Sequence, residues 1–135
     1  MEPNIENAPV SRTAFWIGWA LSILASLALI ISGAMKLLQP ASMAEDTAKG
    51  LDHIGWRMDQ MTGLGILEIA CVVFYLIPQT AVLGAVLVSG YMGGAIATHV
   101  RVGDPFIAQV VIGIVFWLGL WLRDARLHAL LPLRS

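Results

Sequence analysis

The sequence predicts an all-α protein, a transmembrane four-helix bundle with a short interfacial helix between its first two spans. Hydrophobic residues make up 58% and charged residues 13% of its 135 residues, whereas about a quarter of a soluble domain is charged. Residues 13–35 and 106–122 contain no ionisable side chain. A bilayer core about 30 Å thick needs about 20 such residues per helix. The length suits a single domain over residues 1–135.

Four spans are expected, each ended by turn-forming residues. The first covers residues 13–38 and stops before Gln39-Pro40. The second covers residues 58–77 and stops at Pro78, and the third covers residues 81–100. The fourth covers residues 105–122, with Pro105 in its first turn and Asp104 placed to cap it.

The connections between the spans differ in character. Residues 78–80 form so short a turn that the second and third spans must be antiparallel neighbours. The segment 40–57 is longer and polar. Ser42 and Glu45 fit a capping box and Gly50 fits a helix stop, so an interfacial helix is predicted over residues 43–49.

The distribution of cations favours one orientation. Four spans put both termini on one side, with Arg12, Arg123, Arg126 and Arg134 there and Lys36, Lys49, Arg57 and Arg101 opposite. Two of the opposite set, Lys36 and Arg101, belong to a candidate site. Setting them aside, the positive-inside rule predicts a multi-pass protein of a bacterial-type inner (cytoplasmic) membrane with both termini cytoplasmic.

Composition argues against several functional classes. The first apolar segment is longer than the core of a cleavable signal peptide. A net charge of −1 gives no indication of nucleic-acid binding. The single cysteine, Cys71, cannot form an intramolecular disulfide or a CxxC centre. Met58 and Met61 with one histidine are only a weak copper pattern, so no metal site is expected.

One carboxylate lies where a membrane protein rarely places one. Glu68 precedes Ile77 by nine residues, which puts it about 13 Å from that helix end. It must therefore face the bundle, paired or as the neutral acid. The other polar candidates end the first and third spans in the same half of the molecule: Lys36, Thr98, His99 and Arg101.

Two interpretations of this set remain open. In the first, the residues line a polar cavity that opens to the non-cytoplasmic side, with Glu68 at its floor and His99 and Arg101 at its rim. Binding or proton handling would then fall to Lys36, Glu68, Thr98, His99 and Arg101. In the second, Lys36 and Arg101 reach lipid headgroups and His99 ends a helix. Glu68 would then only hold helices in register.

The third span carries two stripes of small residues. Gly90 and Gly94 form a GxxxG pair, and Gly93 forms a second stripe with Ser89 and Ala97. Small residues at this spacing let helices approach closely. One stripe is expected to serve packing within the bundle, and the other a homodimer.

Four segments together resemble the DoxX-like membrane proteins. They are SGAMKLL at the end of the first span, GLGILEI in the second, LIPQTAVLGAVLVSGYMGGAIATHVRVGDP around the third, and the tail LRDARLHALLPL. The resemblance covers about residues 13–133 and implies a four-helix membrane bundle. It also implies that the family's characteristic polar positions are Lys36, Glu68, Gly94, Thr98, His99 and Arg101.

The resemblance implies a redox association. Founding members of that family are similar to subunits of a thiosulfate:quinone oxidoreductase, and other relatives serve in membrane redox homeostasis or in assembly of membrane proteins. We therefore expect a subunit that binds a lipophilic molecule such as a quinone or lipid, with no covalently bound cofactor and a partner supplying the redox centre. A non-enzymatic scaffold or assembly factor is the alternative, and a small proton-coupled carrier is a third option. No self-contained catalytic motif is present.

Overall fold

The computed structural model describes residues 10–130, and in that range the chain is helical throughout apart from its turns and connections. The long helices are α1 (Arg12–Leu38), α3 (Met58–Leu76), α4 (Ala81–Val102) and α5 (Ile107–Arg123). Three short ones complete the fold: η1 (Ala41–Met43), α2 (Ala44–Ile54) and α6 (Ala125–Leu130). The predicted all-α class is confirmed. Arg134, used in the charge count, lies outside the described residues.

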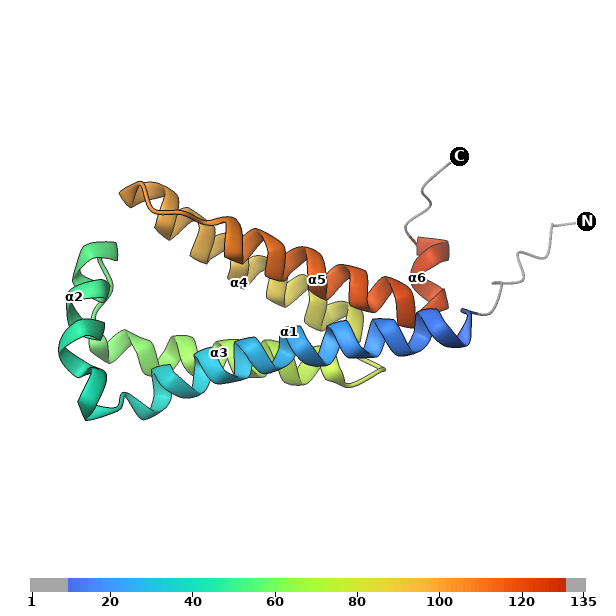
Figure 1. Cartoon of the computed structure of the whole chain (residues 1–135), viewed down its shortest axis with the longest axis horizontal. Helices are drawn as coiled ribbons and strands as arrows, with labels where there is room; N and C mark the ends of the chain where they lie inside the picture. Colours follow the sequence, from blue (N-terminus) through green and yellow to red (C-terminus); the bar gives the residue numbers. More distant parts are fainter. Residues whose placement is uncertain (1–9, 131–135) are drawn as a thin grey trace, which may run out of the picture.

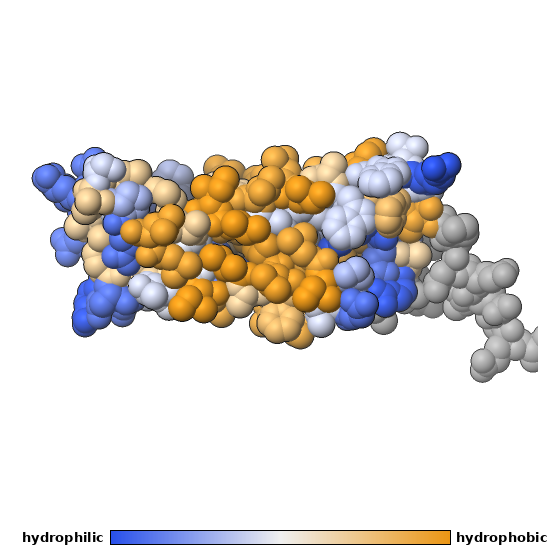
Figure 2. Space-filling view, turned by 90° about the horizontal axis from the view of Figure 1, so that it is seen from below, coloured by the Kyte–Doolittle hydropathy of each residue, from blue (hydrophilic) through white to orange (hydrophobic). Residues whose placement is uncertain are grey.

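The outer surface of the long helices is apolar. Of the described helices, α1, α3 and α4 are long and apolar enough to cross a membrane, whereas α5 is apolar but shorter. Large side chains such as Leu24, Ile31, Ile66 and Ile114 are more than half exposed. Figure 2 shows such residues gathered over the middle of one face, with hydrophilic residues at both ends. Exposure on this scale is typical of a surface that faces lipid.

The four long helices contact one another in a ring. Helix α1 packs against α3 and α5, and α4 packs against the same two helices. They run along the long axis of the molecule (Figure 1), with the start of α1 and α6 at one end and α2 at the other. We call these the terminal end and the α2 end. The turn between α3 and α4 is short, as the sequence predicts, so these two helices are antiparallel neighbours.

Glycines outside the predicted stripes bring the helices together. A Cβ placed on Gly65 would lie 2.8 Å from the backbone oxygen of Gly33, so α1 and α3 touch at their backbones there. A Cβ on Gly18 would lie 2.8 Å from the backbone oxygen of Gly119, which joins α1 to α5. At Gly84 an added Cβ would overlap the backbone of Tyr75. These contacts set the interhelical spacing.

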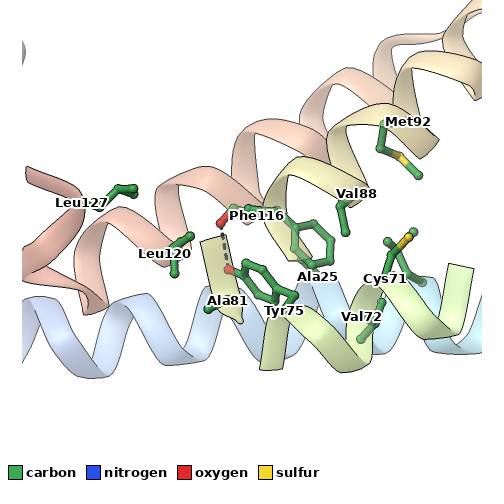
Figure 3. Close-up of a cluster of buried hydrophobic side chains, with 12 residues drawn as sticks. Ala25, Cys71, Val72, Tyr75, Ala81, Val88, Met92, Phe116, Leu120 and Leu127 are labelled. Atoms are coloured by element: carbon green, nitrogen blue, oxygen red, sulfur yellow. Dashed lines mark hydrogen bonds between the residues drawn. The ribbon is translucent and has the colours of Figure 1, made fainter. Parts of the chain in front are cut away.

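A buried cluster fills the ring beside these contacts. Tyr75 and Phe116 lie edge to face with their ring centroids 4.6 Å apart, and the Tyr75 hydroxyl donates to the Phe116 backbone oxygen at 2.8 Å (Figure 3). The hydroxyl of Ser22, on α1, is hydrogen-bonded to the same Tyr75 hydroxyl at 2.8 Å. One fully buried tyrosine therefore links α1, α3 and α5, and its polar group is satisfied as burial requires.

Two helix boundaries differ from the sequence-based expectation. The short helix α2 runs through Gly50 and ends before Gly55, whose φ of 75° is left-handed, and no side chain caps its start. The predicted capping box and the stop at Gly50 were therefore wrong. Helix α5 begins at Ile107 with no side-chain cap. Asp104 is engaged elsewhere, because both of its carboxylate oxygens lie 3.1 Å from Nε2 of His53.

Candidate ligand-binding cavity

An ion pair lies between α1 and α3. Nζ of Lys36 donates to Oε2 of Glu68 at 2.8 Å and to Oγ of Ser32 at 2.6 Å. Oγ of Ser32 in turn donates to the same carboxylate oxygen at 3.3 Å. The Glu68 side chain is 2% exposed and that of Lys36 is 24% exposed. Lys36 therefore reaches inward from the end of α1, and the carboxylate does not lie unpaired inside the helices.

The backbone contact between Gly33 and Gly65 positions this pair. Gly33 follows Ser32 on α1, and Gly65 precedes Glu68 by one turn on α3. Close backbone approach at these glycines brings the two helices near enough for the Lys36 side chain to bridge them. The apolar surroundings of Glu68 in the sequence predicted that it would be paired or neutral, but they did not identify Lys36 as the partner, because the two residues are 32 positions apart.

A cavity of about 800 Å³ opens beside the ion pair. Lys36, Ser32 and Glu68 line one part of it, and apolar side chains from α1, α3, α4 and α5 line most of the rest, among them Leu29, Leu64, Cys71, Met92 and Ile112. Its volume falls in the range of about 300–1,000 Å³ that is usual for sites of small organic ligands. A largely apolar chamber with one charged pair suits a molecule with an apolar body and a polar group.

Three uncharged polar residues also line the cavity. Tyr91 of α4 lines it together with Glu68. Gln109 of α5 lines it too, as does Thr98, whose hydroxyl donates to the Gly94 backbone oxygen at 2.9 Å. Tyr91 and Gln109 were not among the candidates predicted from the sequence. Gln109 is the single amide in the apolar run 106–122, a signal that could have identified it.

His99 does not line the cavity with Glu68. Its Nδ1 lies 2.8 Å from the Ala95 backbone oxygen, so Nδ1 carries the proton in that bond. Its Nε2 lies 3.3 Å from Nε2 of Gln109. With Nδ1 protonated, Nε2 of His99 can accept a hydrogen bond from the Gln109 amide nitrogen. His99 therefore contacts the cavity only through Gln109, and it fixes the orientation of that amide.

Arg101 turns away from Glu68 toward α2. Its guanidinium donates to the backbone oxygen of Ile54, the last residue of α2. Together with the contact between His53 and Asp104, this bond ties the end of α2 to α4 and to the segment after it. Leu51 and Ile54 of α2 and the adjacent Trp56 line the cavity. Helix α2 therefore covers part of the cavity at the α2 end.

The predicted packing glycines border open space. Nothing in the described chain lies within 4 Å of a Cβ placed on Gly90, Gly93 or Gly94. Gly90 and Gly94 line the cavity, whereas Gly93 lines a separate groove between α4 and α5. Within one chain the close contacts are made by other glycines, and packing against a second copy stays a prediction.

No metal centre is evident in the part of the chain that the structure describes. Residues 10–130 contain no group of three or more His, Cys, Asp or Glu side chains that could hold a metal ion. Cys71 is free and buried. The polar groups that line the cavity are an ammonium, a carboxylate, hydroxyls, an amide and the Cys71 thiol.

An apolar outer surface, helices long enough to cross a bilayer and a buried ion pair between them define a helical membrane protein. Comparison with known families places it more narrowly, because the profile described as the DoxX-like family matches residues 20–122. The chain therefore belongs to the DoxX-like family, as its sequence motifs indicate. Searches among curated proteins and among solved structures gave no match.

Proposed function

We propose that the chain is a redox-associated subunit that binds a lipophilic, carbonyl-bearing molecule such as a quinone in the cavity. The observation that carries this proposal is a chamber of about 800 Å³ with mostly apolar walls and the Lys36–Glu68 pair at one side. A quinone has an apolar body and two carbonyl oxygens, so it needs both kinds of surface. It would supply the two-electron chemistry, with electrons exchanged through a partner subunit.

The side chains have definite tasks in this proposal. An ammonium has three donors, and Lys36 uses two of them on Ser32 and Glu68. The third is free to donate to a ligand carbonyl. Glu68 can accept a proton from a ligand hydroxyl, and Ser32 lies between the two charges to relay it. Gln109, held by His99, offers a further polar contact across the cavity.

Two adjacent glycines provide a direct test of the cavity. Gly94 lines it and Gly93 does not, yet both face open space in the described chain. Gly94→Phe should fill the cavity without displacing a helix, and Gly93→Phe is the matched control. We expect Gly94→Phe to weaken quinone binding by about tenfold or more, because the ring occupies the ligand's volume. Binding would be measured by quinone quenching of tryptophan fluorescence in nanodiscs. Equal effects of the two variants would refute the site.

We also propose a four-span bundle in a bacterial-type inner membrane with both termini cytoplasmic. Support comes from the ring of contacts among α1, α3, α4 and α5, and from the location of α1's start and α6 at one end (Figure 1). Labelling Ser135→Cys and Thr47→Cys in intact cells with an impermeant maleimide tests this topology. We expect only position 47 to react. Labelling of position 135 alone would show that the termini face the outside of the cell.

One observation favours the scaffold alternative. The Lys36–Glu68 bond joins α1 to α3, as a purely structural bridge would. If the bridge only stabilises the bundle, replacing both partners by uncharged residues should leave quinone binding unchanged. If the pair contacts the ligand, that double variant should fold and fail to bind.

A further inference from the structure

A buried cation at the terminal end has no carboxylate partner within residues 10–130. Arg123 ends α5 and is 9% exposed. Its Nη2 donates to the Tyr75 backbone oxygen at 2.9 Å, and its guanidinium carbon lies 4.2 Å from the ring centre of Trp19 and 4.8 Å from that of Tyr75. Its Nε is buried and has no hydrogen-bond partner in the described part of the chain. Aromatic faces attract a cation, but they do not neutralise it.

The adjacent carboxylate, that of Asp124, pairs with Arg126 instead. Asp124 accepts from Nε of Arg126 at 3.0 Å and from Nη2 of Arg126 at 2.8 Å. The two arginines and one aspartate therefore leave one net positive charge in the described residues of this cluster. A buried charge is costly unless it is paired, so an anion is expected beside Arg123.

A small pocket adjoins the cluster. It has a volume of about 220 Å³, and its lining includes Arg123, Asp124 and Arg126 together with Phe15, Trp19 and Ala81. Ala81 is the first residue of α4, whose N-cap Thr80 makes no side-chain capping bond. The positive end of that helix therefore adds to the field of the arginines. Polar and aromatic walls meet here at the end of the apolar helices.

We propose that this pocket binds the phosphodiester of an anionic phospholipid. The single net positive charge matches the single negative charge of a phosphodiester. A guanidinium offers paired donors to phosphate oxygens, and Phe15 and Trp19 suit the glycerol and the start of the acyl chains. The site lies at the opposite end of the molecule from the α2 helix that covers the quinone cavity, so the two sites can be tested separately.

The test uses the full chain in detergent with added lipid. Phosphatidylglycerol, phosphatidylcholine and inorganic phosphate are titrated separately, and thermal unfolding is followed by tryptophan fluorescence. We expect phosphatidylglycerol to raise the Tm more than phosphatidylcholine does, because the choline cation opposes the net charge of the site. Stabilisation by inorganic phosphate as well would support the phosphate chemistry. The lipid site would be overturned if inorganic phosphate raised the Tm and phosphatidylglycerol did not, or if the two lipids raised the Tm equally.

Three variants and one control sharpen the result. Arg126 has a side chain 68% exposed, so Arg126→Gln should fold and bind phosphatidylglycerol about fivefold more weakly. Arg123→Gln should bind phosphatidylglycerol more weakly by about tenfold or more, because the Arg123 charge has no carboxylate partner among the described residues. Asp124→Asn should bind more tightly. Arg57→Gln is the matched control, since Arg57 pairs with Asp59 two residues away but does not line the pocket. An equal loss in Arg57→Gln and Arg126→Gln would refute the proposal.

Discussion

The Lys36–Glu68 pair yields the most quantitative prediction. Lys36→Met leaves the Glu68 carboxylate, 2% exposed, with the Ser32 hydroxyl as its remaining hydrogen-bond partner among the described residues. Breaking a buried pair in this way costs about 3–5 kcal/mol of unfolding free energy. Glu68→Gln leaves the ammonium facing an amide oxygen, and Lys36 is 24% exposed, so a smaller loss of about 1–2 kcal/mol is expected.

The double variant should behave differently from the sum of its parts. Lys36→Met with Glu68→Gln contains no charge, and uncharged replacements of buried pairs are often neutral. We expect it to lie within about 1 kcal/mol of the original chain, so the coupling energy should exceed about 2 kcal/mol. Unfolding by sodium dodecyl sulfate in mixed micelles, followed by circular dichroism, measures each corner of the cycle.

The matched control for this cycle is an exposed pair. Lys49 and Glu45 lie on α2 at 2.7 Å with side chains 71% and 82% exposed. Solvent weakens such pairs, so their coupling should be about 0.5 kcal/mol or less. If Lys36 and Glu68 show a coupling energy no larger than that of the control, the two side chains do not form a buried ion pair. The cavity is then not lined by a charged pair.

Three further predictions concern packing, the α2 contact and pH. Gly84→Leu should destabilise the chain by about 3 kcal/mol or more, because a Cβ at this position overlaps the Tyr75 backbone. A Cβ on Gly93 faces open space, so Gly93→Ala should shift the free energy of unfolding by about 0.5 kcal/mol or less. Denaturation in micelles measures the free energy of unfolding of both variants. Arg101→Gln should loosen α2 and speed maleimide labelling of Cys71, the single cysteine, which lines the cavity. Lys49→Gln on the exposed face of α2 should leave that labelling rate unchanged, and equal rates in both variants would contradict the contact. The hydrogen bonds from Arg126 lower the pKa of Asp124 below its usual value. The stability that these hydrogen bonds contribute to the folded chain is therefore fully present above the usual pKa of an aspartate, and it is lost as the pH falls through the lowered pKa of Asp124. The deficit in Tm of Asp124→Asn, measured without anionic lipid, should shrink below about pH 4, and a pH-independent deficit would refute this cause.

The apolar runs made the helices predictable, because length and hydropathy determine which segments a membrane can accept. Some helix ends were less predictable, since local caps compete with tertiary contacts. Asp104 was expected to cap the fourth span, yet α5 begins only at Ile107 and the Asp104 carboxylate contacts His53, 51 residues earlier in the chain. Gly50 resembles a helix stop, but α2 continues to Ile54, and the left-handed residue that ends it is Gly55.

The candidate site was predictable in part. The position of Glu68 in an apolar helix was enough to predict that it faces the interior and needs a partner. Which cation reaches it depends on side-chain length and on the spacing set by Gly33 and Gly65, which sequence spacing does not reveal. His99 and Arg101 share the end of α4, but a helix turns about 100° per residue. They therefore point to different neighbours, the first to Gln109 and the second to α2.

The two ends of the molecule differ in how their buried cations are balanced, and this difference separates the two proposed ligands. Lys36 is neutralised by Glu68 within the chain, so a ligand in the adjoining cavity need bring no charge. Among the described residues Arg123 contacts a backbone oxygen and aromatic faces but pairs with no carboxylate, so a ligand there should be an anion. A neutral quinone and an anionic lipid should therefore not compete. Saturating phosphatidylglycerol should leave the quinone dissociation constant unchanged within about twofold, and mutual displacement would show that one of the two assignments is wrong.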